Sequence, residues 1–172
     1  VIYDFKADKI CSNFLLPRME ANKALREINL QFPQAGIMVF GGDERVYVLS
    51  ASQESQRLLD DEKITYFLHP LEDLPPFWNK VLFAGPPELL QQIERFVASQ
   101  GYQGIYFVFT DPCYYEMMPR GISKGSGVGQ LCELLNLRMR DTWAIGDYYN
   151  DIDLMRSARH TVAMANAPAE IR

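Results

Sequence analysis

The hydrophobic pattern of this 172-residue chain changes its period near Pro119. Over residues 17–118, short runs with a two-residue period, typical of strands, alternate with runs at helical spacing, and turn residues separate them. After Pro119 the pattern reads helix, strand, helix, strand. The first pattern predicts an α+β layer of helices on one face of an antiparallel sheet, and the second predicts a parallel sheet covered by helices. We therefore predict two domains, with a boundary near 120–121.

The composition limits the classes of partner and compartment. The formal net charge is -5, from 17 Lys+Arg and 22 Asp+Glu, so a basic surface for a nucleic acid polymer is not expected. No apolar run reaches the ~18 residues of a membrane-spanning helix, so no membrane partner is expected. The three cysteines, Cys11, Cys113 and Cys132, have no C-x-x-C spacing, which favours free thiols over a zinc site or a disulfide framework. We therefore expect a cytoplasmic protein.

The stretch from Thr142 to Asp153 carries the most chemical information. An apolar strand, predicted to be buried, ends at Gly146, and Asp147 follows at its carboxyl end, where open α/β sheets bind ligands. Asn150 and Asp151 then lie at the predicted start of a helix, where the helix dipole favours carboxylates. Two carboxylates and an amide oxygen this close together are hard oxygen donors that suit Mg²⁺. The alternative is that Asn150 only caps the helix and the acids face solvent.

A second segment of interest surrounds Lys124. Residues 123–128, S-K-G-S-G-V, precede an amphipathic helix. They fit neither the Walker pattern nor the dinucleotide-binding fingerprint, because Gln130 stands where the third glycine of the fingerprint should be. A lysine at a helix N-terminus could hold a phosphate and offset carboxylates that would otherwise repel each other. The alternative is a solvated lysine at a glycine-rich helix start.

Three segments together resemble the Cof-type phosphatases of the haloacid dehalogenase-like (HAD) superfamily. Residues 116–125, E-M-M-P-R-G-I-S-K-G, resemble the family segment E-I-x-P-x-G-V-S-K-G. Residues 146–155, G-D-Y-Y-N-D-I-D-L-M, are similar to its G-D-x-x-N-D-x-x-M loop. Residues 162–167, V-A-M-A-N-A, are similar to its V-A-M-G-N-A strand, with Ala165 where Gly is usual. The order and the spacing of the lysine segment and the acidic loop also match the family.

The resemblance implies a fold and a reaction. The expected fold is α/β, with a partial Rossmann-like HAD core (a parallel sheet with helices) at 1–16 and 119–172. An α+β cap domain with an antiparallel sheet, which confers substrate specificity, is expected at 17–118. The implied reaction has two steps: an aspartate attacks the substrate phosphorus, and water then hydrolyses the aspartyl-phosphate. The implied cofactor is Mg²⁺, and the implied substrate is a small phosphorylated metabolite, either a sugar phosphate or a nucleotide.

The resemblance also implies roles for four residues. Asp147 would be a direct Mg²⁺ ligand. Asp151 would be a catalytic acid that belongs to the metal site through water and also pairs with Lys124. Lys124 would be both catalytic and substrate-binding, because it would bridge the phosphate and the nucleophile, and Asn150 would contact the phosphate or a metal-bound water. Together the metal and the lysine would offset charge on the transferring phosphoryl group.

One departure from the family pattern concerns the nucleophile. The D-x-D-G-T motif is absent, since the only D-x-D in the chain is Asp151-Ile152-Asp153 in the acidic loop. We therefore expect the chain to be a fragment whose attacking aspartate lies outside residues 1–172. Such a fragment should be inactive alone. It should self-associate through its truncated core, or survive only with the missing piece still bound. Two alternatives stay open: a non-catalytic fragment or binding module that keeps the fold, and a phosphomutase of the same superfamily.

Overall fold

The structure is a computed structural model and describes residues 1–43, 45–64 and 66–172. These residues form two compact units. The split unit consists of Val1–Asn13 together with Gly121–Arg172, and the continuous unit consists of Phe14–Arg120. The division falls near the predicted boundaries at 16/17 and 118/119. The assignment of the two units to a catalytic core and a cap stays a prediction.

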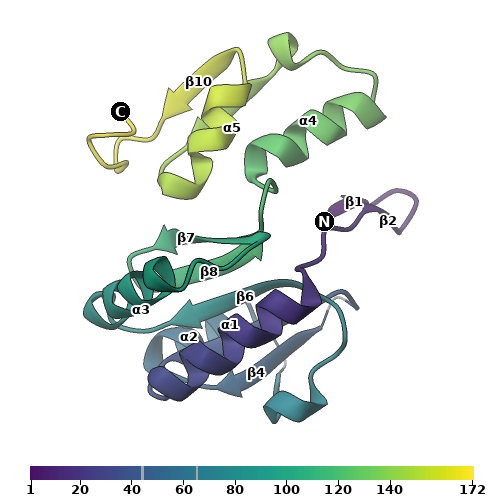
Figure 1. The fold of residues 1–172 in the computed structure, drawn as a ribbon. Coiled ribbons are helices and arrows are strands. Elements are labelled where there is room, and N and C mark those ends of the chain that lie inside the picture. Colours follow the sequence, from purple (N-terminus) through teal and green to yellow (C-terminus); the bar gives the residue numbers. More distant parts are fainter. Residues whose placement is uncertain (44, 65) are drawn as a thin grey trace. The chain divides into compact units, whose positions relative to one another are not determined.

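The continuous unit is built on a six-stranded sheet with the order β5-β4-β3-β6-β8-β7 (Figure 1). Its strands are β3 (Gly36–Gly41), β4 (Val46–Ser50), β5 (Phe67–Leu68), β6 (Trp78–Ala84), β7 (Ile105–Asp111) and β8 (Tyr114–Pro119). Neighbouring strands are antiparallel, except that β4 and β5 are parallel. The antiparallel sheet predicted for this part of the chain is therefore confirmed.

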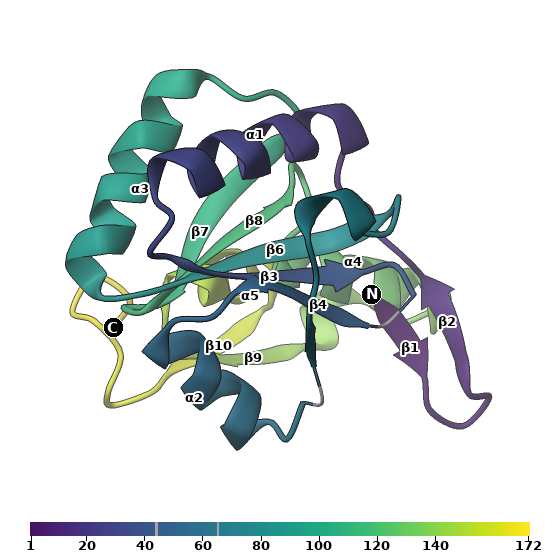
Figure 2. The same cartoon turned by 90° about the horizontal axis from the view of Figure 1, so that it is seen from below.

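Helices cover both faces of this sheet. Figure 2 shows α1 (Arg18–Gln31) and α3 (Pro87–Gln100) on one face and α2 (Gln53–Asp61) on the other. A short 3-10 helix, η1 (Leu71–Asp73), precedes β6. The expectation that all helices lie on one face was wrong for α2, because this helix carries an apolar side of its own. Leu59 on that side is buried in a second, smaller core.

The alternation of side chains along β3 explains the two cores. Ile37 and Val39 point into the larger core, which also contains Leu25 of α1 and buried residues of α3. Met38, between them in sequence, points the other way and packs in the smaller core against α2. All three side chains are fully buried. A strand that is buried on both faces reads as a continuous apolar run, as residues 36–41 do.

Local signals in the sequence account for the helix ends. Ser52 caps α2, since its Oγ accepts the main-chain N–H of Ser55 at 3.2 Å. Pro87 occupies the first turn of α3, where a missing N–H costs nothing. Gly101, with φ of 65°, ends α3 in the left-handed conformation that glycine adopts without strain.

The split unit contains a hairpin and a β-α-β arrangement. Its elements are β1 (Ile2–Asp4), β2 (Lys9–Ser12), α4 (Lys124–Leu134), η2 (Met139–Asp141), β9 (Trp143–Gly146), η3 (Tyr149–Asp151), α5 (Ile152–Ser157) and β10 (His160–Ala163). Strands β9 and β10 pair in parallel, and α5 lies between them in sequence. This confirms the parallel pairing and the partial α/β layer predicted after Pro119.

Strand β9 is not buried as predicted. Ala144 and Gly146 are buried, but Trp143 is 71% exposed and Ile145 is 62% exposed. Parallel sheets are normally covered on both faces. Within the described part of the chain, β9 is therefore covered on one face only.

In residues 1–43, 45–64 and 66–172, no helix is long and apolar enough to cross a lipid bilayer.

We predict that the larger core depends on Leu25 and not on Leu30, five positions along the same helix. Leu25 is fully buried, whereas Leu30 is 84% exposed. Leu25→Ala should lower the free energy of unfolding by about 2–5 kcal/mol because it leaves a cavity, and Leu30→Ala should change it by less than about 0.5 kcal/mol. Urea denaturation followed by the fluorescence of the buried Trp78 measures both. Equal effects of the two substitutions would contradict this assignment of the core.

Candidate functional site

The first residue of α4 is Lys124, and a reciprocal cap fixes the start of this helix. The Ser123 Oγ accepts the main-chain N–H of Ser126 at 3.2 Å, and the Ser126 Oγ accepts the main-chain N–H of Ser123 at 2.8 Å. These bonds satisfy donors that a helix N-terminus otherwise leaves unpaired. Lys124 is therefore anchored at a defined position, while its side chain stays 51% exposed.

The N-terminus of α4 lies against α5, and Gly125 makes this contact possible. A Cβ atom added to Gly125 would lie 2.4 Å from the carbonyl oxygen of Asp153. That distance is too short for any other residue, because the obstructing atom belongs to the backbone. By contrast, a Cβ at Gly127 would meet nothing within 4 Å. The role of Gly125 is thus close helix packing, which brings Lys124 beside the acidic loop that precedes α5.

The acidic loop follows β9 and folds back on its own strand end. The Asp151 Oδ2 accepts the main-chain N–H of Asp147 at 3.0 Å and that of Tyr148 at 3.5 Å. A Cβ on Gly146 would lie 2.6 Å from the Cβ of Asp151, so the strand end must be glycine for the loop to close. Residues 147–151 therefore form a compact turn around the carboxylate of Asp151.

Asp151 connects this turn to α4. Its Oδ1 accepts a hydrogen bond from the Lys124 Nζ at 2.5 Å, which is also an ion pair. Burial alone would raise the pKa of Asp151, but the lysine and the two main-chain N–H groups outweigh burial and lower it. The residue is only 5% exposed. Asp151 is therefore a buried, ionised carboxylate with donors on both oxygens.

Asp147 lies in the same cluster but is exposed to solvent. Its Oδ2 accepts a hydrogen bond from the Asn166 Nδ2 at 3.1 Å. Asn166 was not among the predicted site residues, although it lies in the 162–167 segment that resembles the family. The signal for this contact was the parallel return of β10 beside β9, which brings the residues after both strands to the same end.

The structure thus places all four predicted residues in the split unit. It joins Lys124 to Asp151 and places Asp147 beside Asp151 through the main chain. Asn150 lies half-buried in η3, directly before Asp151. The cluster contains cationic, anionic and amide groups within one short turn and one helix start.

The donor set fits a divalent metal ion only in part. Among the described residues, no group of three or more His, Cys, Asp or Glu side chains could hold a metal ion. The Asp147 carboxylate is exposed and is a hard oxygen donor of the kind that Mg²⁺ prefers. Both oxygens of Asp151 already accept hydrogen bonds. Of the two carboxylates predicted for the metal site, Asp147 is therefore the one that is open to a metal ion directly.

Comparison with known proteins places the chain in a family. The sequence model of the haloacid dehalogenase-like hydrolases matches residues 1–172. The HMP-PP phosphatase of Serratia proteamaculans (strain 568) is 33% identical over 108 residues, which are 62% of this chain and 39% of that protein. The chain thus matches well under half of the length of this relative.

Solved structures show the same fold. A haloacid dehalogenase-like hydrolase from Bacteroides thetaiotaomicron has a TM-score of 0.79 at 22% identity, over 98% of this chain and 64% of that one. A HAD subclass IIB sugar phosphatase has a TM-score of 0.76 at 15% identity, over 96% of this chain and 62% of that one. Because the family model matches the whole sequence and these folds agree, the chain belongs to the haloacid dehalogenase-like hydrolase family.

Proposed function

We propose that this chain is the cap and part of the catalytic core of a Mg²⁺-dependent phosphohydrolase that acts on a small phosphorylated metabolite. The observation that carries the proposal is the ion pair between Lys124 and the buried Asp151, beside the exposed carboxylate of Asp147. In this assignment the continuous unit is the cap and the split unit is part of the core. The four predicted residues keep the roles that the resemblance implies.

Lys124 is suited to hold a phosphoryl group. An ammonium has three N–H donors, and Asp151 accepts from one of them. The half-exposed side chain leaves the others free for phosphate oxygens. A cation at that place would offset the negative charge that develops on the transferring group. The adjacent amide of Asn150 would contribute a further contact to phosphate or to bound water.

Asp147 is suited to hold the metal. Its carboxylate is exposed, and the amide of Asn166 steadies one of its oxygens. Bound Mg²⁺ would polarise the phosphoryl group, and its remaining ligands would come from water, from substrate and from residues outside this chain. Hydrogen bonds to a ligating carboxylate orient it, so Asn166 would be a positioning residue.

Asp151 is better suited to position groups than to ligate a metal. Its two oxygens already accept from Lys124 and from the main chain of the loop. A direct bond to a metal would have to replace one of these hydrogen bonds. We therefore assign Asp151 the water-mediated role: it orients Lys124, holds the loop that carries Asp147, and would meet a metal ion only through water.

The attacking group must come from outside residues 1–172. In the proposed reaction a carboxylate oxygen attacks phosphorus, the bond to the ester oxygen breaks, and that oxygen takes a proton from a general acid that, like the nucleophile, lies outside residues 1–172. Water then cleaves the aspartyl-phosphate, which releases phosphate and restores the carboxylate. The one D-x-D of this chain contains Asp151, whose oxygens are occupied, and Asp153, whose main chain packs against Gly125. The exposed side of β9, with Trp143 and Ile145, offers an apolar surface for further core residues or for a second copy.

The substrate class rests on the relatives. Two of them are named as an HMP-PP phosphatase and a sugar phosphatase, and both names describe small phosphorylated metabolites. A sugar phosphate or a nucleotide therefore stays the proposed substrate.

We predict that residues 1–172 alone do not hydrolyse phosphate esters. Without the attacking carboxylate, a reaction whose groups act as a unit loses several orders of magnitude in rate. The measurement is release of p-nitrophenol from p-nitrophenyl phosphate in millimolar Mg²⁺, with an active HAD phosphatase as the positive control. Turnover by this chain at the rate of the control would overturn the proposal that its nucleophile lies elsewhere.

We predict that Asp147 dominates divalent-metal binding to this chain. Because loss of groups that merely support a ligand weakens metal affinity by about 10–100-fold, Asp147→Asn should weaken it at least about tenfold. The matched control is Asp153→Asn, a change of the same kind at an exposed position in the first turn of α5. Titration with Mn²⁺, followed by electron paramagnetic resonance, measures both. A wild-type chain that binds no Mn²⁺, or equal affinities in the two variants, would contradict the assignment.

We predict that the Asp151 carboxylate stabilises the fold in a pH-dependent way. Its pKa is lowered in the folded state, so its contribution is present above the unfolded pKa and is lost as the pH falls through the lower folded pKa. Asp151→Asn should lower the free energy of unfolding by about 1–3 kcal/mol at pH 7. The difference from wild type should shrink below about pH 4, near the ordinary pKa of the group.

The control for this prediction is Asp141→Asn. Asp141 also forms an ion pair in the split unit, with the Arg138 Nε at 2.7 Å, but both side chains are more than half exposed. An exposed pair contributes little, so this variant should stay within about 1 kcal/mol of wild type at every pH. Urea denaturation at a series of pH values measures both variants. If the effect of Asp151→Asn on the free energy of unfolding did not depend on pH, the charge of Asp151 would not be the source of its stabilising contribution, and the prediction would be wrong.

A further inference from the structure

The two edges of the sheet in the continuous unit differ in how they are protected. One edge is β5, which has two residues. The other is β7, Ile105–Asp111, whose seven residues I-Y-F-V-F-T-D contain no lysine and no proline. Proteins usually blunt an edge strand by making it short, charged or proline-containing, because its free N–H and C=O groups can pair with another strand. The β5 edge is protected because it is short, whereas β7 is long and carries no charge before Asp111.

The hydrogen-bond pattern shows which groups of β7 face outward. In an antiparallel pair, residues alternate between those that bond to the partner strand and those that do not. The Arg120 N–H donates to the carbonyl of Gly104 at 2.9 Å, so Tyr106 and Val108, two and four residues further, are the ones that bond to β8. The main-chain groups of Ile105, Phe107 and Phe109 then point toward the free edge.

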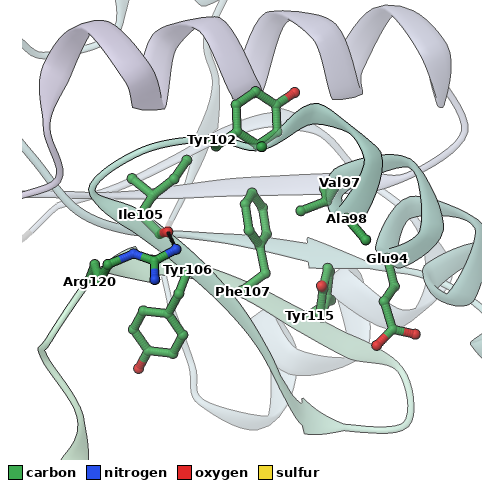
Figure 3. Close-up of a pocket in the computed structure, with 10 residues that line it drawn as sticks. Glu94, Val97, Ala98, Tyr102, Ile105, Tyr106, Phe107, Tyr115 and Arg120 are labelled. Atoms are coloured by element: carbon green, nitrogen blue, oxygen red, sulfur yellow. Dashed lines mark hydrogen bonds between the residues drawn. The ribbon is translucent and has the colours of Figure 1, made fainter.

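Two further contacts agree with this assignment. Ile105 is paired with Pro119, which has no N–H to donate. The carbonyl of Ile105 points toward the free edge, where it accepts a hydrogen bond from the Arg120 guanidinium at 3.4 Å, as the dashed line in Figure 3 shows. Among the described residues, no strand lies on the outer side of β7. The outward N–H and C=O groups of Phe107 and Phe109 are therefore positioned to pair with an added strand.

A hollow of about 340 Å³ lies beside the first half of this edge. Its walls are α3, the chain before β7, β7 itself, Tyr115 of the neighbouring strand β8, and Arg120. Figure 3 shows Tyr102 and Phe107 on one side of the strand and Tyr106 on the other, so the hollow follows the strand edge. A strand added to an edge commonly places alternate side chains in such hollows.

The charges at the two ends of β7 suit a second copy of this strand. Arg120 is held at the Ile105 end by its bond to the Ile105 carbonyl. Asp111 lies at the opposite end, where its Oδ1 accepts the N–H of Cys113 at 2.8 Å. In an antiparallel pair of β7 strands, the Arg120 end of each copy meets the Asp111 end of the other. Opposite charges therefore face each other twice, whereas a parallel pair would place like charges together.

We propose that β7 is a homodimer interface, in which a second copy of the chain adds its own β7 antiparallel to this one. The register places Val108 opposite its own counterpart on the two-fold axis. Phe107 then exchanges main-chain hydrogen bonds with Phe109 of the partner subunit, and Phe109 with the partner's Phe107. This register uses the outward groups on both strands, brings the partner's Phe109 beside the hollow, and brings Arg120 toward the partner's Asp111.

Two substitutions at Val108 test the interface. In this register Val108→Lys places two ammonium groups directly opposite each other, and like charges in that position oppose pairing. The dimer dissociation constant should rise about tenfold or more. The control is Val108→Thr, which keeps a β-branched, uncharged side chain and should keep the dimer. Sedimentation velocity over a range of concentrations measures the dissociation constants, and circular dichroism checks that each variant is folded. A wild-type chain that is still monomeric at about 100 µM, a concentration at which even a weak interface is populated, would overturn the proposal.

A charge exchange and a direct probe separate this interface from a loss of stability and from other surfaces. Arg120→Glu should weaken the dimer, and adding Asp111→Lys to that variant should restore most of the affinity, which two unrelated defects would not do.

Amide hydrogen exchange should slow at Phe107 and Phe109 on dimerisation, while the inward N–H groups of Tyr106 and Val108 stay protected in both states. A dimer that survives Val108→Lys, or that leaves exchange at Phe107 and Phe109 unchanged, uses another surface, such as β9, and overturns the proposal. Binding of an extended peptide to the β7 edge of a chain that stays monomeric would also overturn the proposal.

Discussion

A buried carboxylate needs donors on every side, and in the split unit Asp151 meets this need with groups from two distant parts of the chain. Lys124 bonds to one oxygen, and main-chain N–H groups of residues 147 and 148 bond to the other. An unpaired charge at that depth would be costly, so the loop and α4 must come together for either to be stable. The contact in turn requires glycine at 125, where the backbone of α5 approaches too closely for a Cβ atom, and at 146, where the side chain of Asp151 does.

Sequence reasoning could find the members of this cluster because each belongs to a local signal. Lys124 follows a helix-capping serine, and Asp147 follows an apolar strand, so both could be placed on their elements from residues nearby. The contact between Asp147 and Asn166 could not be found in this way, because it depends on β10 lying parallel to β9. The glycines near Lys124 fit neither phosphate-binding pattern in sequence, and only the position of α5 shows that Gly125 serves helix packing.

The continuous unit shows a different limit. A two-residue period identifies strands and says that alternate side chains share a face, but it does not say which helix covers that face or which strand lies next to which. The pairing of Ile37 with Phe83 joins residues far apart in sequence, and the central position of β3 and β6 follows from such contacts. The helix on the second face of the sheet was not predicted for the same reason. Leu59 of α2 and Met38 of β3 share a core only when β3 is part of the folded sheet.

The exposed strands of the two units differ in the kind of surface that they present. Strand β9 exposes large side chains, Trp143 and Ile145, on one face. Covering that face would be driven by the hydrophobic effect. This effect is not directional, so it is compatible with many partners, and it does not weaken with salt. Strand β7 presents main-chain groups at an edge, with Arg120 and Asp111 at its ends. Hydrogen bonds of this kind specify a register, and the charges that select an antiparallel partner are screened by salt. The exposed face of β9 can therefore pack against any apolar surface of suitable shape, whereas the edge of β7 pairs only with an extended strand, and only in the antiparallel direction.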